Sequence, residues 1–102
     1  MKIIEKLSDM ISDELKDAEK YARCALMHKE DMPELAETFF KLSNDEMTHM
    51  SLLHEQVARI IMDYRRKNGD PPEGMKALYE YLHKKHIDHA AEIKTMQSMY
   101  RG

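Results

Sequence analysis

Helix-breaking residues occur at only a few places in this 102-residue chain. The three prolines and three glycines fall between long apolar segments or at the last position, at Pro33, Gly69, Pro71, Pro72, Gly74 and Gly102. Proline breaks a helix and glycine weakens one, and no two-residue alternation that would indicate a strand persists anywhere. The sequence therefore predicts a single all-α domain over residues 1-102, with helices at about 3–29, 33–67 and 71–100.

Two short connections join the predicted helices. Asp31 with Glu34, and Asp70 with Glu73, resemble capping boxes that would start the second and third helices. Gly69 suits the position after the second helix, where the backbone is often left-handed. Short connections place consecutive helices side by side and antiparallel. We therefore expect a three-helix, up-down-up bundle.

Each predicted helix carries an apolar row with a period near 3.6 residues, and a carboxylate or imidazole interrupts each row. The interruptions are Glu14 in the first helix, Glu46 and His49 in the second, and His86 and His89 in the third. A buried carboxylate is costly unless it is paired or bound to a metal. Each residue advances a helix by about 1.5 Å along its axis. Counted in this way from the two connections, all five residues lie at similar heights along the bundle. We therefore expect one layer of metal ligands, whose oxygen and nitrogen donors suit iron, manganese or zinc.

The first two helices also allow explanations without a metal. Ser43 and Glu46 match the S-x-x-E pattern of a capping box, which would break the second helix, although its apolar row continues without a shift of phase. Leu15 is an alternative core residue to Glu14, whose side chain would then be exposed. His49, taken alone, is explained more simply as a hydrogen-bonded interior histidine than as a ligand.

The third helix contains more histidines than one layer can hold. His83, His86 and His89 are three residues apart and cannot all face inward equally, so a solvated stripe explains them as well as metal binding does. Glu80 and His83 form a second E-x-x-H, which lies lower than the proposed layer and partly off the apolar row. His54 lies off the main row of the second helix, and we expect it at the surface.

Composition argues against several other classes of protein. The net charge is −3 with acids and bases interleaved, which argues against nucleic acid as the main partner. The mean hydropathy is −0.71, and no run approaches the roughly 20 apolar residues of a membrane span. No signal-peptide pattern is evident at the N-terminus. The single cysteine, Cys24, allows neither an intrachain disulfide nor a C-x-x-C knuckle, so we expect a cytoplasmic protein.

The spacing of Glu14, Tyr21 and the E-x-x-H of Glu46 and His49 resembles the first half of a rubrerythrin-like or ferritin-like di-iron bundle. The resemblance covers roughly residues 7–60. It implies that Glu46 is a bridging carboxylate, that Glu14 is a terminal or bridging one, and that His49 is an imidazole ligand. It also implies that Tyr21 donates a hydrogen bond beside the ligands. The implied chemistry is oxidation of Fe(II) by dioxygen or peroxide at paired irons.

The resemblance accounts for only half of the usual ligand set. Proteins of this superfamily usually have a second helix pair, with another glutamate and another E-x-x-H. Two chains could pair into one symmetric four-helix site, which is similar to small encapsulin-associated ferritin-like proteins. Alternatively, the third helix could complete the site within one chain through His86, His89 or Glu92. We favour the homodimer, because a twofold axis doubles the ligands; the sequence does not indicate whether a shell encloses it.

These observations predict a ferritin-like di-iron protein with ferroxidase or peroxide-reducing activity, acting in iron handling or in protection against oxidative stress. One alternative is a metal-independent helical interaction module whose inward polar residues specify its oligomeric state. Another is a zinc- or nickel-binding protein that uses the histidines of the third helix.

Overall fold

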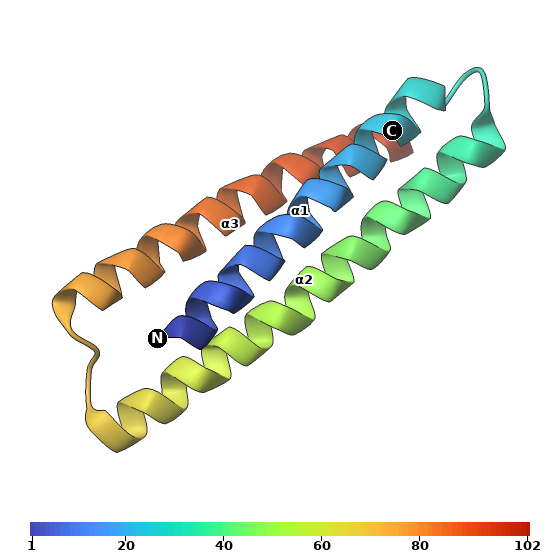
Figure 1. Ribbon diagram of the computed structural model, residues 1–102. Helices are drawn as coiled ribbons and strands as arrows, with labels where there is room; N and C mark the ends of the chain where they lie inside the picture. The colour runs from blue at the N-terminus through green and yellow to red at the C-terminus, as the bar shows by residue number, and fades with distance from the viewer.

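Three long helices make up the whole chain in the computed structural model, which describes residues 1–102. The helices are α1 (Lys2–His28), α2 (Pro33–Asn68) and α3 (Glu73–Arg101), and there is no strand. The predicted all-α, three-helix class is confirmed, and every helix end lies within a few residues of its predicted position. The helices run side by side with alternating directions, and α1 lies between α2 and α3 (Figure 1).

The hydrophobic core is centred on α1. Ile11, Leu15 and Ala18 are fully buried there and pack with Ile93 of α3. Methionines, Leu53 and Val57 of α2 complete this cluster from the other side. Because three long helices lie side by side, the molecule is long and thin, with extents of 55 × 19 × 18 Å. No helix is both long enough and apolar enough to cross a membrane.

α2 and α3 lie farther from each other than either lies from α1, and side chains span the space between them. Near the C-terminus of α3, Gln97 Nε2 donates a hydrogen bond to Ser43 Oγ at 2.9 Å, and Tyr100 Oη donates one to Glu37 Oε2 at 2.8 Å. Toward the other end of the molecule the space is open, and forms a cavity of about 400 Å³ lined by α1, α2 and α3. The bundle is therefore closed at one end and hollow at the other.

The two predicted capping boxes do not form. Met32 and Pro72 occupy the N-cap positions of α2 and α3, and neither helix has a side-chain cap. Asp31 lies one residue too early to cap α2, and its carboxylate contacts His28 Nδ1 at 3.3 Å instead. Pro33 starts α2, because a proline already has the φ angle that the first turn of a helix requires. Pro72 precedes the first turn of α3 with an extended ψ of 147°.

Gly69 ends α2, as predicted. Its φ is 76° and its ψ is −165°, a combination that essentially only glycine adopts without strain. Its N–H donates a hydrogen bond to the carbonyl of Arg65 at 2.9 Å, which satisfies one of the free carbonyls at the end of the helix. The chain therefore turns sharply here and returns along α1 as α3.

Candidate metal centre

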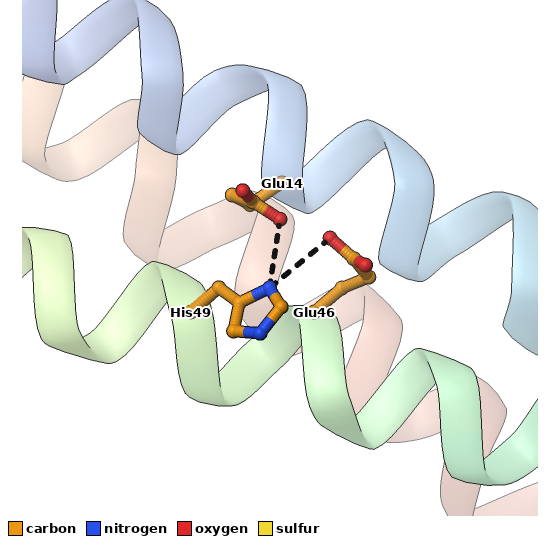
Figure 2. Close-up of side chains that lie close together, drawn as sticks. All are labelled: Glu14, Glu46 and His49. Carbon is orange, nitrogen blue, oxygen red and sulfur yellow. Dashed lines mark ion pairs between the residues drawn. The ribbon is translucent and has the colours of Figure 1, made fainter.

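Three of the predicted ligands meet in the seam between α1 and α2. Glu14 projects from α1, and Glu46 and His49 project from adjacent turns of α2 (Figure 2). His49 Nδ1 lies 3.5 Å from Glu14 Oε2 and 3.7 Å from Glu46 Oε2. One ligand atom from each side chain falls within 4.8 Å of the other two. An ion placed among these atoms would need only small rotamer changes to be bound by all three.

A close helix contact one turn away positions this cluster. Ala18 and Ser43 are fully buried where α1 meets α2. Ser43 Oγ donates a hydrogen bond of 2.7 Å to the carbonyl oxygen of Ala18. Small side chains let two helices approach closely, and this contact fixes the register that places Glu14 opposite Glu46. Because α2 is helical without interruption from Pro33 to Asn68, Ser43 does not cap a helix, and the capping explanation of Glu46 is wrong.

Glu14 and Leu15 do not compete for one position. Leu15 is fully buried in the core, whereas the Glu14 side chain is 27% exposed in the seam. Adjacent residues on a helix point about 100° apart, which is enough for one to face the core while the other faces the groove beside it. The row of polar interruptions therefore marks the edge of the core rather than its centre.

Partial burial and mutual repulsion characterise the electrostatics of the cluster. The Glu46 side chain is only 18% exposed. Its pKa is raised, chiefly by hydrogen bonding to the Glu14 carboxyl group and then by burial and by the charge of Glu14, while His49 partly opposes the shift. Two carboxyl groups this close need a shared proton or a cation between them. Two carboxylates and one imidazole are also the donors that iron, manganese and zinc accept, so the residues fit such an ion.

The cluster opens away from α3. The His49 side chain is 54% exposed, and α3 passes behind α1 and α2 in Figure 2, on the side opposite the three side chains. α3 instead contributes Ile93 to the core on the far side of the α1–α2 pair. The possible ligand group at this point consists of Glu14, Glu46 and His49, so a single chain supplies three ligands here.

The structure does not bring His86 and His89 into this cluster. His86 Nε2 is hydrogen-bonded to Ser12 Oγ at 3.0 Å, and His89 Nε2 lies 2.9 Å from Glu19 Oε1. Ser12 and Glu19 flank Glu14 in height, so the heights estimated by counting residues were sound. They lie on other faces of α1, however, because at about 100° per residue Ser12 is rotated by about 200° from Glu14, and Glu19 by about 140°. Counting along the chain gives height and says nothing about which face is used.

Tyr21 lies two turns from Glu14 along the same seam. Its ring stacks on Phe39 with a centroid separation of 6.2 Å, and its hydroxyl makes no hydrogen bond to Glu14, Glu46 or His49. In the isolated chain Tyr21 therefore acts as a packing residue beside the site, and its role as a hydrogen-bond donor stays a prediction.

One contact between histidines was missed by the sequence analysis. His54 Nε2 of α2 and His83 Nδ1 of α3 lie 3.0 Å apart, with ring centroids 4.9 Å apart. Burial lowers the pKa of His54, and the nearby His83 lowers it further. The sequence did hold a signal, because the two residues are almost equally far from Gly69 on either side of the second connection. His54 was placed at the surface because only the apolar row of α2 was considered.

Comparison with known proteins adds no further constraint. No family model matches the chain, and neither a curated protein nor a solved structure matches it.

Glu46→Gln should remove a pH dependence of stability that the metal-free protein has. Because folding raises the Glu46 pKa above its ordinary value of 4.5, the stability linked to its proton is complete below that value. It is lost as the pH rises through the folded pKa. Urea unfolding with a chelator at pH values from 4 to 7 measures this, with the exposed Glu55→Gln as the control. We expect Glu46→Gln to stabilise the metal-free fold near neutral pH; an unchanged profile would contradict the carboxyl–carboxyl interaction.

Proposed function

We propose that this chain is a ferritin-like metal protein that forms a homodimer around a two-metal site, with iron as the principal metal and manganese or zinc as alternatives. The observation that carries the proposal is the convergence of Glu14, Glu46 and His49 within 4.8 Å on the open side of the α1–α2 pair. Its activity would be oxidation of Fe(II) or reduction of peroxide in the cytoplasm, in iron handling or in protection against oxidants.

The dimer follows from the shortage of ligands. Each chain contributes two carboxylates and one imidazole, and the imidazole side chain is 54% exposed. A twofold axis beside this face would bring together four carboxylates and two imidazoles. That is the donor set of the two-metal carboxylate bundles, which use glutamates and two E-x-x-H motifs. The pairing would also turn two α1–α2 hairpins into a four-helix core, leaving α3 on the outside of each hairpin.

The surface of the isolated chain is large enough to support this pairing. A compact 12.1 kDa monomer is expected to expose about 6000 Å², whereas this chain exposes 6930 Å². Its radius of gyration is 16.4 Å, against roughly 13 Å for a compact domain of this length. The excess area of about 900 Å² is close to the roughly 800 Å² that each partner buries in an interface of standard size.

Apolar side chains flank the cluster on both helices. Met10, one turn before Glu14, is 42% exposed, and Leu52, one turn after His49, is 57% exposed. Leu42, one turn before Glu46, is half-buried. Residues three or four apart share a face of a helix, so these side chains surround the ligands with the apolar surface that a homodimer interface usually has.

The roles of the residues follow from their positions. The resemblance to di-iron bundles gives Glu46 the role of bridging carboxylate, and Glu14 would bind from the opposite helix. His49 would bind one ion through Nδ1, the nitrogen that already faces both carboxylates. Bound iron would supply the one-electron change between Fe(II) and Fe(III), with dioxygen or peroxide as the oxidant. Apolar neighbours and the partner would exclude bulk water.

Metal analysis of tag-free protein tests the proposal. After anaerobic loading with Fe(II) and removal of excess metal, we expect about one iron per chain. Glu46→Gln with His49→Gln should lose nearly all of it while keeping its helical circular dichroism, and His89→Ala should keep it. Wild-type protein that retains no metal would leave the cluster as a hydrogen-bonded polar layer. Aerobic oxidation of Fe(II) no faster than in buffer would contradict ferroxidase activity.

Met10→Glu should weaken the dimer. A charge buried beside Glu14 in the proposed interface is costly because it is close to two other carboxylates. Analytical ultracentrifugation of the wild-type protein should show a dimer. We expect the dissociation constant of the Met10→Glu dimer to be at least tenfold higher than that of the wild type. Met99→Glu, on the exposed surface of α3, is the matched control. Equal dissociation of both variants, or a monomeric wild type, would contradict the proposed interface.

A further inference from the structure

His54 and His83 form the closest contact between two imidazoles in the molecule. The ring nitrogens that face each other, Nε2 of His54 and Nδ1 of His83, are 3.0 Å apart. The ring planes are inclined by 23°, and their centroids are 4.9 Å apart. Each ring thus places one nitrogen against a nitrogen of the other ring.

This nitrogen separation is the one that a single metal ion imposes on two imidazole ligands. Zinc–nitrogen bonds are about 2.0–2.1 Å long. Two such bonds at angles between 90° and the tetrahedral value put the nitrogens roughly 2.9–3.4 Å apart. The separation of the two nitrogens would therefore change by only a few tenths of an ångström when both bind one ion.

A carboxylate is placed to become the third ligand. Glu80 precedes His83 by three residues on α3, so the two share a face of the helix. Glu80, His54 and His83 line the same cavity of about 400 Å³. The Glu80 carboxylate does not yet lie within 4.8 Å of both imidazoles. Glu14, Glu46 and His49 form the one group of three possible ligands whose atoms are that close together. Glu80 is exposed, so its side chain is free to rotate onto an ion.

The neighbouring histidine has a different partner. His86, one turn beyond His83, lines the same cavity but is buried and hydrogen-bonded to Ser12. The candidate site is therefore formed by two helices, with His54 from α2 and the second E-x-x-H motif, Glu80 and His83, from α3. It lies in the part of the molecule where the α2–α3 space is hollow.

We propose that His54, His83 and Glu80 bind one late first-row divalent cation, of the Zn²⁺ or Ni²⁺ class, which fastens α3 to α2 beside the open cavity. Imidazole and carboxylate donors suit these ions. The site is separate from the Glu14–Glu46–His49 cluster and does not depend on the proposed function. Three protein ligands leave a coordination position for water or for a small molecule in the cavity.

Binding requires a change of tautomer and no net release of a proton from a neutral pair. In the metal-free pair, one of the two facing nitrogens carries the hydrogen of the N–H···N bond. When an ion binds both nitrogens, that hydrogen must lie on the other nitrogen of the same ring. Each neutral imidazole then donates one lone pair to the ion and keeps one N–H.

The test uses full-length, tag-free protein from which metal has been stripped, in a Glu46→Gln, His49→Gln background that removes the other cluster. Calorimetric titration with Zn²⁺ should show one site per chain. His54→Gln or His83→Gln should weaken binding by at least 10–100-fold, and Glu80→Gln should weaken it less. His28→Gln, a histidine bonded to Asp31 at the far end of α1, should leave binding unchanged.

Hydrogen exchange separates a fastening role from loose surface binding. We expect Zn²⁺ to slow amide exchange in both the C-terminal half of α2 and the N-terminal half of α3, and to have no such effect in His54→Gln. Binding that is unaffected by His54→Gln and His83→Gln, or weakened equally by His28→Gln, would overturn the proposal. Tight binding without protection of α3 would overturn the fastening role.

Discussion

The close approach of α1 and α2 at Ala18 and Ser43 determines where the other functional side chains lie. Because the Ser43 hydroxyl reaches the Ala18 carbonyl across the seam, the register between the two helices is fixed at this level. That register puts Glu14 opposite Glu46, and Tyr21 opposite Phe39 two turns further along. A slip of one turn would move each carboxylate by about 5.4 Å and leave the half-buried Glu46 without a partner.

Two different faces of the α1–α2 pair carry the polar residues, and α3 covers only one of them. On the covered face, His86 and His89 are used in hydrogen bonds to α1. On the other face, Glu14, Glu46 and His49 lie near the exposed side chains of Met10 and Leu52. In the proposed dimer, this asymmetry would leave the open face free for a second α1–α2 pair, because α3 packs on the opposite side.

The sequence was sufficient for the helices and for the core of the site, and insufficient for the way the helices rotate about their axes. The 3.6-residue apolar period and the positions of proline and glycine predicted α1, α2 and α3. The E-x-x-H spacing of Glu46 and His49, together with Glu14, identified the three side chains that meet. The capping boxes failed because α2 and α3 start one or two residues later than the aspartates required. His86 and His89 lie outside the cluster, and the contact between His54 and His83 was not predicted. Counting residues along a helix gives the height of a side chain, whereas the direction in which it points depends on packing against all neighbouring helices. Iron and the homodimer stay proposals, because the order of residues in one chain specifies its own helices and not the second surface or the ion that would complete the site.

The central claim is that the open face of α1 and α2 is one half of a metal site shared by two chains. Anomalous X-ray scattering at the iron edge, from crystals of the iron-loaded protein, tests it most directly. The account predicts two iron peaks per dimer, lying between two α1–α2 hairpins and related to each other by the twofold axis, beside Glu14, Glu46 and His49 of both chains. Iron bound by one chain alone, or density only at His54 and His83, would contradict it.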